Sequence, residues 1–248
     1  MQTISIIMAM TQETDGLIQE LKKAGFVSGK NNSFIKGNLT VNLFKCGIMF
    51  RKKKVLSKKI DRLRKSDKLI FTGIAGGVNR SLKFGEIVIP DKICLLEDKT
   101  KSIKNHEPLI RELTDCANKY NFSLKRTASH ATADKLIDHK IKNSLTDIDT
   151  IDMEAYHLLE WLKENSITAT FFKIISDDSS AKLPSEQILI QFIISPYKAF
   201  VKNFYRHPIE YFRAVRIVRD SKRAVAMLSK YVIKWLISET EKSSINTN

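Results

Sequence analysis

The chain has few cysteines and no long apolar run. Cys46, Cys94 and Cys116 are odd in number and show neither a CxxC nor a Cys/His spacing, which argues against a disulfide framework and a zinc site. No apolar stretch approaches the length that spans a membrane. The first ten residues, MQTISIIMAM, lack a preceding basic region, so we expect no signal peptide. These absences favour a protein of the reducing cytoplasm.

Acidic residues are scarce relative to basic ones. The chain has 42 Lys and Arg against 27 Asp and Glu, which gives a net charge of +15. Such an excess fits binding to nucleic acid, to an anionic membrane surface or to an anionic ligand. The alternative is that the lysines are scattered over solvated faces of the protein and bind no partner. Nucleic acid is the weakest of these partners, because aromatic residues are not interleaved with the basic ones and no binding motif is present.

The length of 248 residues suits one domain with a sizeable core. Strand-like and helix-like segments alternate without an internal repeat or a linker, which predicts an α/β fold. Buried strands are expected at residues 4–9, 68–72, 148–153 and 169–176. A helical region is expected at residues 185–238, followed by a frayed tail at residues 239–248.

Three acidic residues follow predicted strands. They are Glu13, Glu154 and Asp177. Side chains just past the carboxyl ends of parallel strands face the same crevice of an open sheet, and ligands bind there. Each residue alone has a plain structural explanation, since acids cap helices and turns. Together they indicate proton-transfer chemistry or the binding of a polyhydroxylated ligand.

Two glycine-containing segments are candidates for contact with a ligand. The run Gly73 to Gly77 lets backbone N–H groups approach a ligand, although it lacks the GxGxxG spacing and also fits a tight structural turn. Arg51 follows Gly47 at the start of a basic stretch. It could meet an anion at a helix start, or it could be one more exposed cation.

Five short motifs occur in a fixed order along the chain. They are AMTQE (9–13), TGIAGG (72–77), LKFGEIVIPD (82–91), DMEA (152–155) and ISD (175–177). Together they resemble the purine nucleoside phosphorylase superfamily, in particular its methylthioadenosine/S-adenosylhomocysteine nucleosidases. The resemblance implies a three-layer α/β sandwich around a twisted, mixed central β-sheet. Residues 1–184 would form the catalytic domain, with residues 185–238 as a helical extension of that domain.

The segments 175–184 and 205–228 are similar to the hopanoid-associated members of the superfamily, which release adenine from adenosylhopane. We therefore predict cleavage of the adenine N-glycosidic bond in a 5′-substituted adenosine, with adenosylhopane as the favoured substrate. A methylthioadenosine/S-adenosylhomocysteine nucleosidase is the first alternative. A non-catalytic nucleoside- or lipid-binding protein on this scaffold is the second.

The resemblance assigns roles to the three acids and their neighbours. Glu13 matches the glutamate that activates the attacking water. Glu154, next to Met153, matches the glutamate that holds the ribose 2′-hydroxyl. Asp177 matches the aspartate that protonates N7 of the leaving base, and Ser176 matches the residue that orients it.

The resemblance also implies further contacts with the ligand. Gly76 and Gly77 belong to the substrate-binding loop, and Asp134 matches an aspartate near the base. Leu136 stands where the nucleosidases have an aromatic residue that stacks on adenine. Phosphate remains an alternative to water, because Gly47 and Arg51 could hold it. No metal or other cofactor is implied, and a homodimer is common among relatives.

The C-terminal region is strongly basic. Residues 195–236 contain ten Lys or Arg and only two acids, Glu210 and Asp220. Apolar residues recur there at helical spacing, which predicts an amphipathic basic helix. This helix either packs on the core or attaches to an anionic membrane. In the second case the protein would be peripheral on the inner face of the cytoplasmic membrane, where a lipid-tailed adenosine derivative would reside.

Overall fold

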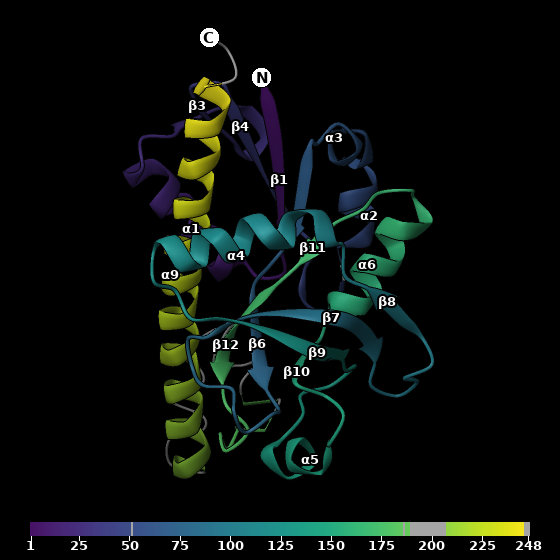
Figure 1. Cartoon of the computed structure of the whole chain (residues 1–248). Coiled ribbons are helices and arrows are strands. Elements are labelled where there is room, and N and C mark those ends of the chain that lie inside the picture. Colours follow the sequence, from purple (N-terminus) through teal and green to yellow (C-terminus); the bar gives the residue numbers. More distant parts are fainter. Residues whose placement is uncertain (51, 186, 189–206, 246–248) are drawn as a thin grey trace.

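The computed structural model describes residues 1–50, 52–185, 187–188 and 207–245. One of its two mixed β-sheets is built around the N-terminal strand (Figure 1). Its strand order is β11 (Thr170–Phe171), β5 (Lys68–Phe71), β1 (Gln2–Met8), β4 (Leu39–Lys45), β3 (Ser33–Lys36) and β2 (Val27–Ser28). The strands from β11 to β4 run parallel, whereas β3 and β2 continue as antiparallel neighbours.

The second sheet closes on itself. Its strand order is β12 (Lys173–Asp177), β6 (Ile74–Gly77), β10 (Thr150–Asp152), β9 (Leu124–Thr132), β7 (Ile87–Leu95) and β8 (Ser102–Lys104). An additional pairing of β12 with β7 joins five of these strands into a small barrel. Closure brings strands from distant parts of the sequence side by side and leaves β8 at the edge of the sheet.

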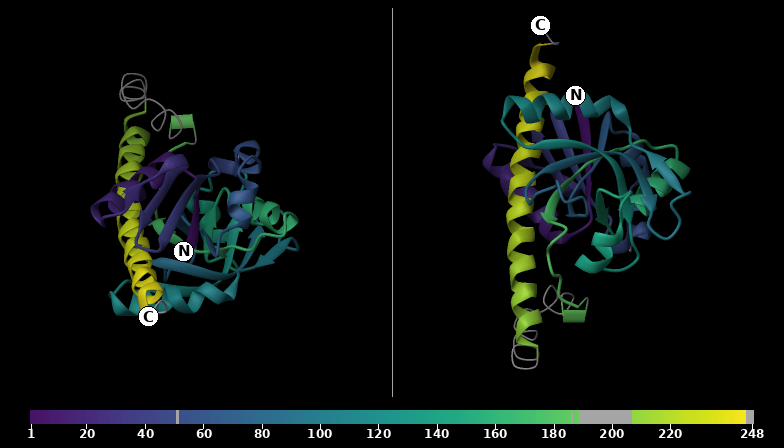
Figure 2. Two further views of the ribbon diagram at one scale, coloured as in Figure 1. Left: turned by 90° about the horizontal axis from the view of Figure 1, so that it is seen from above. Right: turned by 60° about the horizontal axis from the view of Figure 1, so that its bottom comes forward.

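Helices cover both sides of the sheets. The described α-helices are α1 (Thr11–Lys23), α2 (Lys53–Ser57), α3 (Ile60–Arg64), α4 (Ile110–Lys119), α5 (His139–Ser144), α6 (Ala155–Glu164) and α9 (Pro208–Ile245). Helices α1, α4 and α9 pack on one side, and α2, α3 and α6 pack on the other (Figures 1 and 2). This arrangement confirms the predicted layered α/β fold with mixed central sheets.

Strand β1 explains how two cores form on one sheet. Successive side chains of a strand point to opposite faces. Ile4 and Ile6 accordingly belong to the core beneath α1 and α9, whereas Ile7 belongs to the core beneath α6. Burial on both faces is typical of parallel strands, and it accounts for the adjacent apolar residues Ile6, Ile7 and Met8 in β1.

The strand predicted at residues 169–176 is two strands. β11 pairs with β5 in the first sheet, whereas β12 pairs with β6 and β7 in the second. The chain therefore passes from one sheet to the other at Phe172, which is fully buried. Hydrophobicity does not reveal such a change of sheet, because the stretch 169–176 is apolar on both sides of Phe172 apart from Thr170, Lys173 and Ser176. Its consequence is that β12 ends in the barrel, next to β6.

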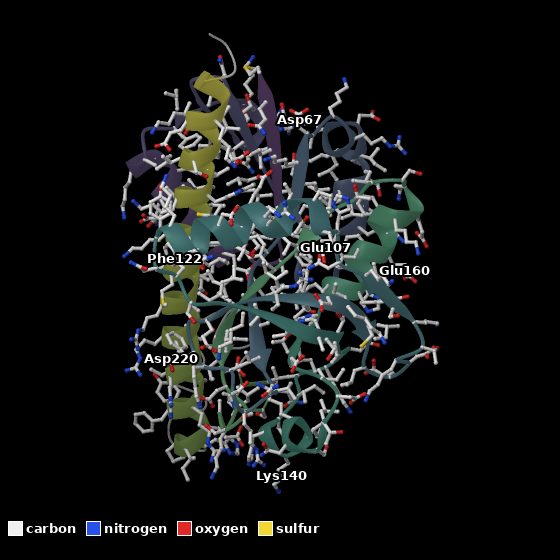
Figure 3. All side chains as sticks on the ribbon, viewed as in Figure 1. Asp67, Glu107, Phe122, Lys140, Glu160 and Asp220 are labelled. Atoms are coloured by element: carbon white, nitrogen blue, oxygen red, sulfur yellow. The ribbon has the colours of Figure 1, made fainter. Side chains whose placement is uncertain are left out.

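The long helix α9 is part of the core. It packs against α1, α4 and β12, and its Leu228, Val232 and Trp235 are fully buried. A side chain at Gly16 of α1 would place Cβ 2.7 Å from Cγ1 of Val225, so this glycine allows the close approach of the two helices. The ring of Phe122, labelled beside α9 in Figure 3, lies 5.3 Å from that of Tyr231.

The prediction that the chain frays from residue 239 is wrong. Helix α9 continues to Ile245, and only 2% of Glu239 is exposed. The Glu239 carboxylate is held by Lys68 of β5 and lies 2.9 Å from Nζ of Lys242. Such an ion pair between distant segments cannot be recognised from the polar composition of the tail.

The apolar stripe predicted for the C-terminal helix divides into two parts. Its second half is buried, as described above, whereas Ile209, Phe212 and Val215 in the first half are exposed. Residues 189–206, including Lys198, Lys202 and Arg206 of the basic region, lie outside the described part of the chain. None of the described helices combines the length and apolar character needed to cross a membrane.

Candidate active site

A cavity of about 190 Å³ is lined by residues of β6, β10 and β12, of α5 and of the first half of α9. Seven segments of the chain supply its walls. The lining residues are Ala9, Met10, Gln12, Glu13, Ile48, Ile74, Ala75, Gly76, Lys135, Leu136, Ile137, Lys142, Ile151, Asp152, Met153, Glu154, Ser176, Asp177, Leu183, Ile217, Val218 and Ser221. The three acids singled out in the sequence thus face one cavity.

Glu13 is held in the first turn of α1 by backbone donors. Its Oε2 accepts hydrogen bonds from the N–H groups of Ala9 (3.0 Å) and Met10 (2.8 Å), and its Oε1 accepts one from Ile74 (2.9 Å). Burial raises the pKa of Glu13 above its ordinary value, although Lys173 and these hydrogen bonds oppose the rise. The carboxyl group is therefore fixed in position and more basic than an exposed glutamate.

The backbone at Gly73 approaches the Glu13 carboxyl group closely. A Cβ atom at Gly73 would lie 2.5 Å from Oε1 of Glu13, which leaves no room for a side chain. The first glycine of the predicted loop is therefore explained by contact with a carboxyl group of the protein. Contact between a ligand and the backbone at Gly73 is therefore not needed to explain why this residue is glycine.

A buried lysine lies behind the acids. Lys173, the first residue of β12, has no exposed surface, and its Nζ lies 3.0 Å from Oδ2 of Asp152 and 3.9 Å from Oε2 of Glu154. The same ammonium lies 4.4 Å from the centre of the Phe71 ring, where it gains a cation–π contact. Lys173 thus joins the start of β12 to the end of β10 through its ion pair with Asp152.

The electrostatics of this cluster follow from its burial and its pairing. Burial would lower the pKa of Lys173, but the carboxylates of Asp152, Glu154 and Glu13 outweigh it and raise the pKa. Burial would likewise raise the pKa of Asp152, but Lys173 and His130 hold that pKa far below its ordinary value. Nε2 of His130 lies 3.0 Å from Oδ1 of Asp152. Lys173 and Asp152 therefore stay charged inside the protein.

Asp152 also fixes the start of α6. Its Oδ1 accepts hydrogen bonds from the backbone N–H groups of Glu154 (3.1 Å) and Ala155 (3.0 Å). These donors belong to the first turn of the helix, where free N–H groups favour a negative charge. Glu154 itself is the N-cap residue and is buried. Its side chain is directed to the cavity by a turn that Asp152 stabilises.

Asp177 ends β12 on the other side of the cavity. Its Oδ1 accepts a hydrogen bond of 2.8 Å from Oγ of Ser176, and its Oδ2 is bound by the ammonium of Lys142 from α5. Gly76 of β6 borders both groups, because a Cβ atom there would lie 3.1 Å from Oδ2 of Asp177. The carboxyl group is thus engaged on both oxygens.

Several predicted ligand contacts lie outside the cavity lining. Asp134 is exposed and is not among the lining residues; its Oδ1 lies 3.2 Å from Nε2 of His157. Leu136 does line the cavity. Gly77 is not among the lining residues, and its position against Asp177 is that of a packing contact. Gly47 is buried and lies beside the lining residue Ile48. Arg51 is outside the described residues.

Four charged residues of the site were not predicted: Lys135, Lys142 and Asp152 line the cavity, and Lys173 lies behind the acids. Asp152 belongs to the DMEA motif but was not considered as a site residue, and Lys142 carries no recognisable signal among the lysines around it. Lys173 does carry one, because it is the only charged residue in the apolar stretch 169–176. A lysine inside a buried strand needs a partner, and that rule indicates a nearby carboxylate.

Comparison with known proteins identifies the family. Residues 3–143, more than half of the chain, match the family described as the phosphorylase superfamily. The chain belongs to the phosphorylase superfamily. No curated protein gave a match to this superfamily member.

Solved structures share the fold of this superfamily member at low sequence identity. Futalosine hydrolase of Helicobacter pylori has a TM-score of 0.68 at 13% identity, covering 96% of this chain and 98% of the other. A 5′-methylthioadenosine/S-adenosylhomocysteine nucleosidase of Campylobacter jejuni has a TM-score of 0.67 at 18% identity, covering 95% and 99%. A putative nucleosidase of the same description from Francisella philomiragia has a TM-score of 0.66 at 18% identity, covering 95% and 99%.

Proposed function

We propose that this enzyme of the phosphorylase superfamily cleaves the N-glycosidic bond between adenine and the ribose of a 5′-substituted adenosine. The observation that carries the proposal is the meeting of Glu13, Glu154 and Asp177 in one cavity, although they come from three distant segments. Glycosyl cleavage needs acidic groups on both sides of the scissile bond, and this arrangement supplies them.

The roles follow from the charges that develop in the reaction. The sugar becomes positive and the leaving base becomes negative as the bond breaks. Asp177, held by Ser176, serves the base, and Glu154 with Met153 contacts the ribose. Glu13 takes a proton from the attacking water, a task that its raised pKa supports. No cofactor is required by this scheme.

Water is the proposed nucleophile. The Glu13 carboxylate is buried and would repel a phosphate anion placed next to it. Gly47 does not line the cavity, and among the described residues of the loop that could have held phosphate Ile48 alone lines it. We therefore expect base release in phosphate-free buffer at the rate measured with phosphate, and faster release with phosphate would identify a phosphorylase.

The 5′-substituent is proposed to be apolar. Ile48, Leu183, Ile217 and Val218 line the cavity, and the last two belong to α9. Adenosylhopane, with its lipid tail, remains the favoured substrate on this basis. The similarity to structures of 5′-methylthioadenosine/S-adenosylhomocysteine nucleosidases favours 5′-methylthioadenosine or S-adenosylhomocysteine as the second candidate.

The test is adenine release by the purified protein from 5′-methylthioadenosine and from a lipid-tailed adenosine, each with and without phosphate. A higher kcat/KM for the lipid-tailed substrate supports the first candidate. Asp177→Asn should abolish release while the protein remains folded, whereas Asp178→Asn, which does not reach the cavity, should not. Nucleoside binding without any release would support the non-catalytic alternative.

Attachment to an anionic membrane is part of the proposal. In the first half of α9, 67% of Ile209 and 59% of Phe212 are exposed, and Arg213 and Arg216 lie on the same turns. Exposed apolar residues flanked by cations are typical of helices that bind lipid surfaces. We expect sedimentation with phosphatidylglycerol vesicles, reduced by Ile209→Ser/Phe212→Ser but not by Val55→Ser, which is exposed elsewhere. Equal sedimentation of all three proteins would contradict this.

A further inference from the structure

Lys142 places an ammonium group inside the proposed base pocket. Only 1% of this residue is exposed, although lysine is among the residues least often buried. Its Nζ binds Oδ2 of Asp177, and Oδ1 of that carboxylate already accepts the hydrogen bond from Ser176. The group proposed to serve the leaving base therefore carries a second charged group at its side.

The position of Lys142 is built into the local structure. Oδ1 of Asp138 caps α5 by accepting hydrogen bonds from the backbone N–H groups of Lys140 (2.8 Å) and Ile141 (3.0 Å). On the capped helix Lys142 is buried. Lys140 is exposed at the surface (Figure 3). Gly76 provides the space, because a Cβ atom there would lie only 2.6 Å from Nζ of Lys142.

The ion pair presents a donor and an acceptor side by side. A lysine ammonium has three N–H donors and no acceptor, whereas an ionised carboxylate only accepts. Adenine presents the complementary pattern on one edge, with N7 as acceptor and the 6-amino group as donor. A base that brings its 6-amino group to Asp177 therefore brings N7 to Lys142.

We propose, on the basis of the proposed function, that Lys142 delivers the proton to N7 of the leaving adenine and that Asp177 positions its ammonium. As the bond between C1′ and N9 breaks, its electron pair passes to the purine, and N7 takes a proton from Nζ. Water adds to C1′ and gives its proton to Glu13. Lys142 is left as a neutral amine and Glu13 as a carboxylic acid. A proton transfer between them through solvent restores both groups, so that adenine and the free sugar are the only products.

The test compares Lys142→Ala with Lys140→Ala, the exposed lysine of the same helix. On 5′-methylthioadenosine, Lys142→Ala should lower kcat by about 10²–10⁴, the usual contribution of general acid catalysis, and Lys140→Ala should leave it unchanged. On 4-nitrophenyl β-ribofuranoside, whose leaving group needs no proton, Lys142→Ala should keep most of its activity. Ethylammonium chloride should restore part of the loss on 5′-methylthioadenosine.

A second variant keeps both side chains. Gly76→Ala would push the ammonium away from its place, because the new methyl group occupies that space. We expect it to reproduce the leaving-group dependence of Lys142→Ala. Equal losses on both substrates would assign Lys142 a structural role and overturn the proposal, as would full activity of Lys142→Ala. If the unaltered enzyme releases base from no nucleoside, the proposed function fails as well.

Discussion

Replacing Lys173 by methionine should destabilise the protein strongly. Methionine retains the length and much of the volume of the side chain but removes the charge that compensates Asp152 and Glu154. Breaking a buried ion pair from one side costs about 3–5 kcal/mol, because the partner remains buried and charged. For a chain of this length, that loss lowers the melting temperature by roughly 6–20 °C.

The assay is thermal and urea unfolding followed by circular dichroism at pH 7. Lys163→Met is the matched control, because Lys163 is exposed on α6, and it should change the free energy of unfolding by less than about 0.5 kcal/mol. The double variant Lys173→Met/Asp152→Asn should be less destabilised than the sum of the single variants, since the uncompensated charge is gone. A Lys173→Met protein as stable as the control would refute the argument.

Two further predictions concern the acid limb of the activity and the end of α9. Because burial raises the pKa of Glu13 in the free protein and the base must be ionised, kcat/KM should rise with pH through a midpoint above the ordinary value of 4.5; a midpoint at or below 4.5 would exclude Glu13 as the base. Deletion of residues 239–248 should lower the melting temperature, because it leaves Lys68 without its Glu239 partner; an unchanged melting temperature would show that the last turns of α9 are dispensable.

Much of the fold was predictable from local patterns. The apolar strands and the helices between them give the layered α/β arrangement, because each segment must bury one or both faces. The split of residues 169–176 into β11 and β12 was not predictable, since it depends on the closure of the second sheet by the pairing of β12 with β7. The same pairing determines where Lys173 points.

The candidate site was predictable only in part. Glu13, Glu154 and Asp177 line one cavity, as expected, but the rule for the carboxyl ends of parallel strands does not explain it. β6 pairs antiparallel with β10 and parallel with β12, so the strands before Glu154 and Asp177 run in opposite directions. Lys142 lies 35 residues from its partner Asp177 on a short helix, and nothing in its neighbourhood distinguishes it from Lys140. Asp134 matches a family motif, yet its exposed side chain pairs with His157. A sequence motif predicts which residue corresponds to a family residue, whereas the direction of its side chain depends on the local turn.

Measurement of adenine release from 5′-methylthioadenosine in phosphate-free buffer tests the central claim most directly. The proposed function predicts catalytic release by the unaltered protein, with release lost in both Glu13→Gln and Asp177→Asn and retained in Asp178→Asn. Release that persists in Asp177→Asn, or a complete absence of release from this substrate and from a lipid-tailed adenosine, would contradict it.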